Sequence, residues 1–384
     1  MSAPPPLRIL QTVDSLAERQ GGPSRTIVLL AEAQARHGAE LHLLARPEAE
    51  TDPVLAPDPK LATLHLATLA QRRHIFARLL SAPGPALLHD NGVWLAANRA
   101  AAAAARRAGR PYVISPHGML EPWALNWNPW RKRLAMALFQ KRLLNQAAGL
   151  LATAEPERAN LRRLVSRTPI ATIANGVALP ARIPPHNMAP DATRTLLFLS
   201  RLHPKKNLPA LITAWSQLPK TQFPHWQLRI AGPDERGHSA DLARQIEALG
   251  PDSRIHLQGP VADEDTSALY AAADLFILPS NSENFGIVVA EALAHGRPVI
   301  TTKGTPWSDL PALGAGWWTD PTPTALAAAM SEAMALPPQA RADMGQRGAA
   351  LVAARHGWPL IAEQTLAFYH WLLHAGPKPE FVDA

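Results

Sequence analysis

Short apolar runs alternate with longer mixed segments along the first half of the chain, and this pattern predicts strands that alternate with helices. The mixed segments include Pro23–His37, which begins with proline as many helices do, and the alanine-rich run Ala100–Ala105. Strand–helix–strand units of this kind build a parallel sheet. The predicted strands of this half are Leu7–Val13, Leu41–Leu44, Ala86–His89, Pro111–Ser115, Gly149–Thr153 and Ile170–Ile173.

A second series of the same kind follows a proline-rich, irregular stretch at Ala178–Ala192. Its predicted strands are Thr195–Ser200, Gln227–Gly232, Ile255–Gly259, Leu275–Leu278 and Pro298–Thr301. The pattern predicts an α/β fold of two Rossmann-like doubly wound domains that face a central cleft. We expect the domains at 1–178 and 195–358, a linker at 179–194, and a C-terminal helix in 359–384 that packs back across the domains.

Size and composition support this organisation and exclude several classes of protein. The 384 residues exceed one hydrophobic core, and 47% hydrophobic with 18% charged residues indicates a globular chain. Without cysteine, disulfides and cysteine-ligated zinc are excluded. The chain shows neither a signal peptide nor a long apolar span, so we expect a cytoplasmic protein. A net charge of +7 suits an anionic ligand or an anionic membrane surface and is too small to indicate nucleic acid.

Two glutamates eight positions apart, Glu283 and Glu291, are the strongest chemical signal. The predicted strand Leu275–Leu278 ends at a proline, Glu283 follows in a polar loop, and Glu291 lies on the helix that Gly286 opens. In an open parallel sheet, ligands bind beyond the carboxyl ends of the strands. Carboxylates accept hydrogen bonds from vicinal hydroxyls, so the pair can hold two sugar rings. Taken singly, each glutamate is equally consistent with an ordinary helix residue.

Basic and glycine-rich loops follow other predicted strands. Arg201 and Lys206 come directly after the first strand of the second domain, where an arginine fork and a lysine charge suit a diphosphate. The alternative is an ordinary basic loop. Gly21 and Gly22 occupy the matching place in the first domain, before a helix whose free amides favour anions. They do not form GxGxxG, so dinucleotide binding is disfavoured.

His117 follows the predicted strand Pro111–Ser115 and is a candidate hydrogen-bonding group in the cleft. A nearby anion would favour its protonated form. A lone histidine is more often structural, and only its position after a strand favours a role at the site.

The segment from Trp123 to Gln146 combines tryptophans, cations and aliphatic residues. A helix with this composition can lie on an anionic bilayer, with its cations among the headgroups and its tryptophans at the interface. We place the candidate membrane surface at Trp127–Gln146. A core-packing helix with a solvated basic face is an equally open alternative.

No HExxH, Walker or GxSxG motif occurs. We also expect no Asp-x-Asp carboxylate site for a metal bound to a nucleotide diphosphate. We therefore expect no metal and no cofactor, with Arg201 and Lys206 supplying the positive charge that Mg²⁺ supplies in other enzymes.

Together these motifs resemble the large retaining glycosyltransferase family 4, which has the two-domain GT-B fold. The resemblance covers nearly the whole chain and is strongest from Thr195 to Thr305. Glu283 and Glu291 match the family's pair of glutamates separated by seven residues, Arg201 and Lys206 its basic pair, and Gly21-Gly22 its N-terminal glycine loop. The turn at Asn175–Val177 and the strand from Ala273 to Ser280 also fit.

The resemblance implies a role for each matching residue. Glu291 would hold the ribose hydroxyls, and Glu283 the transferred sugar together with the backbone amides of Asn284, Phe285 and Gly286. Arg201 and Lys206 would stabilise the leaving diphosphate. The implied catalytic residues are Glu283, His117, Arg201 and Lys206. The implied donor-binding residues are Gly21, Gly22, Arg201, Lys206, Gly232, Val261, Glu283, Asn284, Phe285, Gly286, Ile287 and Glu291, where Val261 and the backbone of Gly259 and Pro260 would meet the base.

The family further implies transfer of a hexose from a nucleotide diphosphate sugar with retention, without a protein nucleophile. Similarity of His117–Leu125 to enzymes of bacterial exopolysaccharide and lipopolysaccharide synthesis favours a glycan or lipid-linked acceptor. The loop Ala231–Asp234 holds fewer glycines than in many members, which leaves the base preference open. A nucleotide-sugar epimerase of the same fold and a non-catalytic partner subunit are the alternatives.

Overall fold

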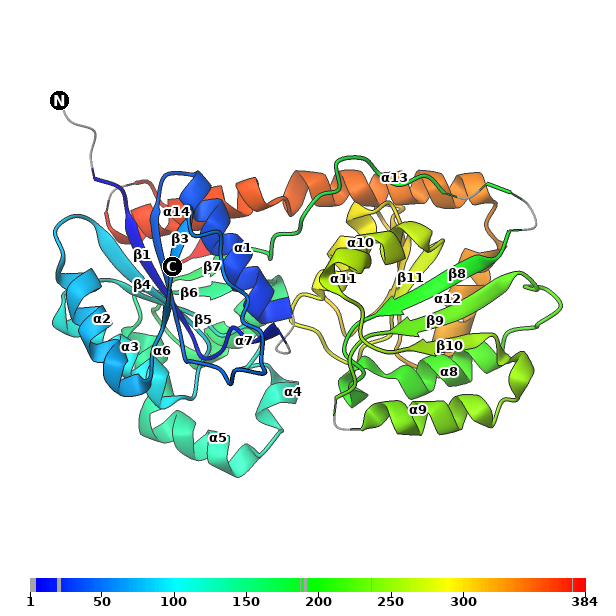
Figure 1. Ribbon diagram of the computed structural model, residues 1–384, viewed down its shortest axis with the longest axis horizontal. Helices are drawn as coiled ribbons and strands as arrows, with labels where there is room; N and C mark the ends of the chain where they lie inside the picture. Colours follow the sequence, from blue (N-terminus) through cyan, green and yellow to red (C-terminus); the bar gives the residue numbers. More distant parts are fainter. Residues whose placement is uncertain (1–4, 19–21, 187, 190–191, 236, 375) are drawn as a thin grey trace. The chain divides into compact units, whose positions relative to one another are not determined.

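The computed structural model describes residues 5–384 except 19–21, 187, 190–191, 236 and 375. The chain divides into two compact units, and each is described by itself (Figure 1). Unit 1 consists of Met1–Gly176 together with Trp358–Ala384, and unit 2 of Val177–Gly357.

Unit 1 is built on an eight-stranded sheet with the order β14-β7-β6-β5-β4-β1-β2-β3. All neighbours are parallel except β14 and β7. The strands are β1 (Arg8–Val13), β2 (Glu40–Ala45), β3 (Ala62–Leu66), β4 (Ala86–Asn91), β5 (Tyr112–Ser115), β6 (Gly149–Ala152), β7 (Ile170–Thr172) and β14 (Val382–Asp383). The strand order reverses at β1 and β4, which is the switch point of a doubly wound sheet.

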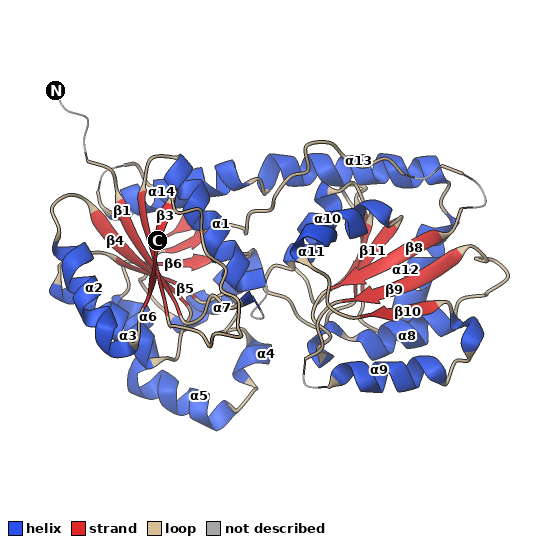
Figure 2. Ribbon diagram, viewed as in Figure 1, coloured by secondary structure: helices blue, strands red, loops and turns tan. Residues whose placement is uncertain are grey.

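Helices cover both faces of this sheet (Figure 2). They are α1 (Gly22–Arg36), α2 (Leu69–Ser81), α3 (Ala96–Arg107), α4 (Pro122–Leu125), α5 (Pro129–Ala135), a π-helical turn (Met136–Gln140), α6 (Lys141–Gln146), α7 (Glu155–Leu164) and α14 (Trp358–Leu372). One core joins Ile9 and Val13 of β1 to α1 and α14, whereas the opposite core joins Leu10 of the same strand to α2 and α3. Because both faces are buried, the central strands contain apolar runs, whereas the carboxyl ends of β1 and β4 carry buried polar residues such as Gln11 and His89.

Unit 2 contains a six-stranded parallel sheet with the order β10-β9-β8-β11-β12-β13. The strands are β8 (Arg194–Leu199), β9 (Trp226–Ala231), β10 (Ile255–Gln258), β11 (Leu275–Leu278), β12 (Val299–Thr302) and β13 (Gly316–Thr319). The helices are a 3₁₀ turn (Pro204–Lys206), α8 (Leu208–Ser216), α9 (His238–Glu247), a 3₁₀ turn (Pro251–Ser253), α10 (Asp263–Ala272), α11 (Ile287–Ala294), α12 (Pro323–Ala335) and α13 (Pro338–Arg355). The switch point of this sheet lies between β8 and β11, so the loops that follow these two strands flank one position at the carboxyl edge.

The proline-rich stretch belongs to unit 2, and the C-terminal segment belongs to unit 1. Buried Arg297 donates a hydrogen bond to the Pro184 carbonyl at 2.7 Å, which ties the proline-rich stretch to unit 2. Phe368 and Tyr369 of α14 are fully buried in the core of unit 1, and β14 pairs with β7. The C-terminal segment is therefore part of the first unit's fold.

The basic aromatic segment is not one helix from Trp123 to Gln146. α4 ends at Leu125, and Asn128 then takes a left-handed conformation (φ 53°) from which α5 begins. A single helical rod runs only from Pro129 to Gln146 and contains the π turn, so Trp123 and Trp127 precede it. No helix in the described part of the chain combines the length and apolarity needed to cross a bilayer.

Candidate functional site

The switch point of the second sheet brings Lys206 and Glu283 into direct contact. Lys206 ends the 3₁₀ turn after β8, and Glu283 lies in the loop after β11. The Lys206 Nζ atom donates to Glu283 Oε1 at 2.6 Å, and Ser280 Oγ donates to the same oxygen at 2.6 Å. The two charged side chains are only 10% and 11% exposed. The ion pair is therefore largely shielded from solvent, and the attraction between its charges is stronger than it would be on an open surface.

Glu283 is ionised at neutral pH. Burial acts to raise its pKa, but the charges of Lys206 and Lys205 and the hydrogen bonds from Lys206 and Ser280 outweigh burial and hold the pKa below its ordinary value. The site therefore presents a fixed carboxylate.

The loop that carries Glu283 is fastened to its neighbours through the backbone. The Asn281 amide donates to the Lys205 carbonyl at 2.9 Å, and the Glu283 amide donates to the Gly304 carbonyl at 2.6 Å. A Cβ at residue 304 would overlap the Ser280 carbonyl oxygen, so this approach requires glycine. The position of Glu283 thus follows from three neighbouring strand ends.

The start of α11 supplies free amides beside Glu283. Gly286 caps the helix in the left-handed region (φ 79°), and the first amides of a helix lack acceptors within it. Phe285 is buried against Trp307 and His356, and its carbonyl accepts from Trp307 Nε1 at 2.7 Å. Phe285 can therefore offer a ligand only its backbone N–H group.

Glu291 lies one turn farther along α11 and is held from the side by Tyr270 of α10. The tyrosine hydroxyl donates to Glu291 Oε2 at 2.8 Å. The second glutamate therefore has a fixed partner that its own loop and helix do not contain.

Arg201 is not joined to this cluster by a hydrogen bond or ion pair in the described part of the chain. Its side chain is 47% exposed, and its guanidinium pairs with Glu235 at 2.8 Å. The two basic residues expected at a diphosphate thus differ, because Lys206 is buried in the site and Arg201 lies at the surface.

Gly232 and Val261 lie in the loops after β9 and β10, at the same edge of the sheet. Gly232 has φ 140°, its amide donates to the Gly259 carbonyl at 3.1 Å, and a Cβ there would overlap the Ser200 carbonyl oxygen. Gly232 therefore holds three loops together, and its own N–H group is already used.

In unit 1, His117 lies beyond β5 with a left-handed backbone (φ 49°). Its Nε2 contacts Asn91 Oδ1 at 2.9 Å, and Asn91 Nδ2 donates to the Thr12 carbonyl at 3.3 Å. The amide nitrogen thus faces an acceptor, which leaves its oxygen to receive a proton from His117 Nε2. Burial lowers the pKa of His117 to about 4. Without an anion beside it, His117 is therefore neutral near pH 7.

The glycine loop of unit 1 falls only partly within the described residues. Gly21 lies outside them, whereas Gly22 begins α1. Ser24 Oγ, in the first turn, donates to the Ser15 carbonyl at 3.0 Å and holds the helix start against the loop after β1. This geometry suits an anion at the amino end of α1.

Five partners of these groups were not anticipated from the sequence: Asn91, Glu157, Glu235, Tyr270 and Ser280. Glu157, for example, is buried and accepts hydrogen bonds from the Gly118 amide at 2.7 Å and the Thr153 amide at 2.8 Å, which fixes the turn beside His117. Only Ser280 carried a usable signal, since it directly follows a strand that ends at a proline.

An Asp-x-Asp sequence, Asp263-Glu264-Asp265, bears on the expectation that no metal takes part. It forms the first turn of α10. Residues two apart on a helix point in different directions, and acidic side chains favour a helix start. Among the residues with described placement, no group of three or more His, Asp or Glu side chains has the arrangement of a metal site.

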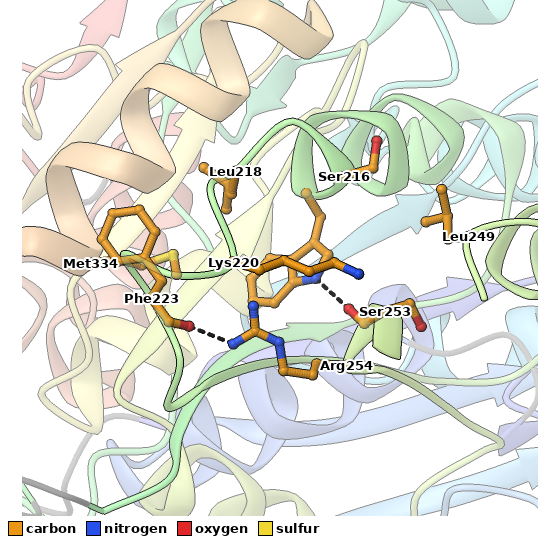
Figure 3. A pocket seen from close by; sticks show the side chains of 9 residues that line it. Ser216, Leu218, Lys220, Phe223, Leu249, Ser253, Arg254 and Met334 are labelled. Atoms are coloured by element: carbon orange, nitrogen blue, oxygen red, sulfur yellow. Dashed lines mark hydrogen bonds between the residues drawn. The ribbon is translucent and has the colours of Figure 1, made fainter. Parts of the chain in front are cut away.

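A cavity of about 120 Å³ in unit 2 lies away from these residues (Figure 3). Its walls include Trp215, Phe223 and Arg254, and the latter two precede β9 and β10, so the cavity lies near the amino ends of these strands. The Arg254 guanidinium donates to the Phe223 carbonyl and, at 2.9 Å, to the Pro224 carbonyl. The Arg254 guanidinium is thus already bonded to backbone carbonyls. The carboxyl edge of the sheet remains the candidate active site.

Comparison with known proteins assigns the chain to a family. Residues 182–350 match the model of "Glycosyl transferases group 1", and residues 21–176 match that of "Glycosyl transferase 4-like domain". A GDP-mannose:cellobiosyl-diphosphopolyprenol alpha-mannosyltransferase of Xanthomonas campestris is 28% identical over 267 residues, 68% of each chain. A D-inositol 3-phosphate glycosyltransferase of Kineococcus radiotolerans is 30% identical over 256 residues, 60% of this chain and 58% of the relative.

Solved structures share the fold across nearly the whole chain. Sucrose-phosphate synthase from Thermosynechococcus elongatus superimposes with a TM-score of 0.78 at 22% identity, covering 96% of this chain and all of that one (100%). Anabaena HepE in complex with UDP and glucose gives 0.69 at 22% identity, covering 94% and 98%. With both family models matched in consecutive halves and this fold in common, the chain belongs to glycosyltransferase family 4, whose members have the GT-B fold and transfer a sugar from a nucleotide sugar with retention.

Proposed function

We propose that this glycosyltransferase transfers a hexose from a nucleotide diphosphate sugar to a glycan or lipid-linked acceptor in bacterial surface polysaccharide synthesis, without a metal ion. The observation that carries the proposal is the buried Lys206–Glu283 pair beside the amino end of α11. It places a cation, a carboxylate and free amides at one strand edge, which is the chemistry that a sugar diphosphate requires.

Lys206 is the proposed electrostatic catalyst. Only one of its three N–H groups is needed for Glu283, so others can donate to the leaving diphosphate. Charge that develops on the departing phosphate is then stabilised by a cation held in place before the reaction, and in many enzymes such stabilisation contributes more to the rate than any other effect. The amino end of α11 and that of α1 would add backbone donors. Arg201 would join after exchanging Glu235 for a phosphate oxygen.

Glu283 is proposed to hold the transferred sugar. Lys206 and Ser280 both contact its Oε1 atom, which leaves Oε2 to accept from a sugar hydroxyl. The amides of Asn284, Phe285 and Gly286 would complete this contact, and Glu291 and the backbone near Val261 would hold the ribose and the base. In retaining transfer without a protein nucleophile, the C1–O bond to the diphosphate breaks, the acceptor oxygen bonds to C1 on the same face, and the departing phosphate takes the acceptor's proton.

His117 is proposed to contact the sugar as a neutral group. Its Nε2–H is directed to Asn91, so Nδ1 carries the lone pair and can accept from a hydroxyl. This supports a role in orientation rather than in charge stabilisation.

The test measures nucleoside diphosphate release from a panel of nucleotide sugars with and without EDTA, using lipid-linked and free glycan acceptors. We expect one donor to be consumed in an acceptor-dependent way, an α- or β-anomer matching the donor by NMR, and no effect of EDTA. Glu283→Gln should abolish transfer while binding of the free nucleoside diphosphate persists. Release of a free sugar or an epimer in the absence of an acceptor would favour the epimerase alternative, and no consumption by any donor would favour a non-catalytic subunit.

An anionic membrane surface is the proposed location of the acceptor. Exposed apolar side chains recur every four residues along α5 and the π turn: Trp130 (64% exposed), Leu134 (53%) and Leu138 (71%). Trp127 (51% exposed) lies just before α5. Arg131, Arg133, Lys141 and Arg142 are exposed in the same segment, and no acidic residue occurs from 122 to 154. Apolar anchors among cations suit anionic headgroups, and the polyprenol-linked acceptor in the name of the Xanthomonas relative is consistent with this location.

Co-sedimentation with phosphatidylglycerol and phosphatidylcholine vesicles tests the surface. We expect binding to the anionic vesicles that weakens with salt and that Trp130→Ala with Leu138→Ser reduces about tenfold. Leu69→Ser is the matched control, because Leu69 is 46% exposed on α2, outside this segment. Equal binding by the double variant and the control variant would contradict the proposed surface.

A further inference from the structure

We infer that Tyr270 is a positioning residue for Glu291 and thereby sets how strongly the enzyme distinguishes ribose from deoxyribose in its donor. The inference rests on the proposed function, in which Glu291 holds the ribose hydroxyls. Tyr270 itself lies behind the carboxylate and is fully buried.

The contact between the two residues is direct. Tyr270 is on α10, and its hydroxyl donates to Glu291 Oε2 at 2.8 Å, with a longer approach of 3.4 Å to the Val288 carbonyl. A buried hydroxyl is costly without a partner, and a bond to a charged acceptor is stronger than a neutral one. Burial and the nearby Glu291 charge hold the pKa of Tyr270 well above its ordinary value, so the phenol stays protonated and the carboxylate accepts.

Two further groups hold the backbone of Glu291. His295 Nδ1 contacts the Glu291 carbonyl at 2.8 Å, so this nitrogen carries the proton. Burial lowers the pKa of His295, which leaves Nε2 to accept from Ser267 Oγ at 2.9 Å. The rings of His295 and Tyr270 stack with centroids 5.1 Å apart.

One face of α10 therefore supports Glu291 at two points. Ser267 and Tyr270 are three residues apart and share that face. The tyrosine fixes the carboxylate, and the serine fixes the helix end through His295. A carboxylate held in one rotamer loses less conformational freedom when it binds vicinal hydroxyls, so the support converts directly into affinity.

The experiment compares UDP, GDP and ADP with their 2′-deoxy forms by isothermal titration calorimetry on the full chain. The unaltered protein should bind one ribonucleotide more tightly than its deoxy form. Tyr270→Phe keeps the ring and removes the hydroxyl, and we expect about tenfold weaker binding of the ribonucleotide with a smaller loss for the deoxynucleotide. A merely structural role would weaken both by the same factor.

Tyr112→Phe is the matched control. The buried Tyr112 hydroxyl donates to Asp90 Oδ2 at 2.8 Å in unit 1, so this change removes an equivalent phenol–carboxylate bond. It should lower the melting temperature in a comparable way and leave the ribose-to-deoxyribose ratio unchanged.

Glu291→Gln separates failure of this inference from failure of the proposed function. If Glu291→Gln leaves the ratio unchanged, Glu291 does not hold the ribose and the proposed role of that residue fails. If Glu291→Gln removes the discrimination but Tyr270→Phe does not reduce it, the positioning role alone is overturned. With both correct, Tyr270→Phe should change nothing further in the Glu291→Gln background.

Discussion

At the residue scale, each glutamate of the candidate donor site is held by hydrogen bonds from side chains elsewhere in unit 2. Glu283 has Lys206 and Ser280 on one oxygen, and Glu291 has Tyr270. Each carboxylate is fixed before a ligand arrives, which reduces the cost of binding and of reorganisation in the transition state.

Lys206→Met should lower the stability of the folded protein as well as its proposed transferase activity. It leaves the Glu283 carboxylate buried without its cation, and we expect the free energy of unfolding at pH 7 to fall by about 3–5 kcal/mol. The lowered pKa of Glu283 contributes stability above its ordinary value of 4.5 that is lost as pH falls through the folded pKa. The difference in the free energy of unfolding between the unaltered protein and Lys206→Met should therefore become smaller as the pH falls. Urea unfolding from pH 7 to pH 4 measures this difference.

Lys205→Met is the control for this change, because Lys205 acts on the pKa of Glu283 by its charge alone. Lys205→Met should lower the free energy of unfolding clearly less than Lys206→Met does. Equal losses of unfolding free energy in the two variants would mean that the Lys206–Glu283 hydrogen bond adds no stability beyond the charge of a nearby lysine.

His117 should stay neutral throughout the physiological range. Burial lowers its pKa to about 4, so protonation is resisted in the folded state between about pH 6.5 and 4, where the unfolded chain takes up a proton. Stability should therefore decline as pH falls through this window. An NMR titration of the Cε1–H signal, assigned by its loss in His117→Gln, should show no midpoint above pH 5. A midpoint near 6.5 would show that the side chain is solvated.

At the element scale, the site is made by the ends of strands rather than by their interiors. The loops after β8, β9, β10, β11 and β12 are joined to one another by backbone hydrogen bonds such as Ser200 N to Ala231 O at 3.1 Å and Gly232 N to Gly259 O at 3.1 Å. Glycine is required where these loops approach too closely for a side chain.

Gly232→Ala tests this arrangement. At φ 140° an L-residue is strained, and the added Cβ would overlap the Ser200 carbonyl, so we expect a loss of more than about 2 kcal/mol in the free energy of unfolding. Gly259→Ala is the matched control, because a Cβ there meets nothing within 4 Å. Thermal or urea unfolding of the two variants should separate them, and similar stabilities would show that the loops can part freely.

The sequence predicted most central strands within a residue or two at each end, since strands buried on both faces are continuous apolar runs. The edge strands β3, β13 and β14 were not predicted. In β3, for example, Thr63 and Leu66 are exposed, so the apolar run that marks a buried strand is broken. Prediction of the basic aromatic helix failed at Asn128, whose left-handed conformation ends one helical segment and starts the next.

At the scale of the whole molecule, the two units have the same arrangement of parallel strands around their first strand, and the C-terminal segment of the chain belongs to unit 1. Both sheets reverse their strand order beside the first strand, which places a ligand edge in each. α14 and β14 then complete unit 1 with side chains such as Ile361 and Phe368.

Unit 1 needs the distant C-terminal segment to complete its core, whereas unit 2 is one continuous stretch of chain, and truncated proteins test this difference. A 1–176 fragment lacks the apolar face that α14 provides, so it should fail to fold, whereas 1–176 joined by a glycine–serine linker to 358–384 should fold. A 177–357 fragment should fold without additions. Circular dichroism and cooperative thermal unfolding measure these outcomes, and a cooperatively folded 1–176 fragment would contradict the expected dependence on α14.

The sequence by itself determined the class of fold and the family, and it predicted Lys206, Glu283 and Glu291 as candidate site residues, because hydrophobic runs and motif spacing are local properties of the chain. Only the tertiary structure decided their partners. Tyr270 and Glu291 belong to different helices, Lys206 and Glu283 are 77 positions apart, and Arg201 pairs with Glu235. Such contacts depend on which strand ends become neighbours in the sheet, and that order is set by long-range packing that no local pattern records.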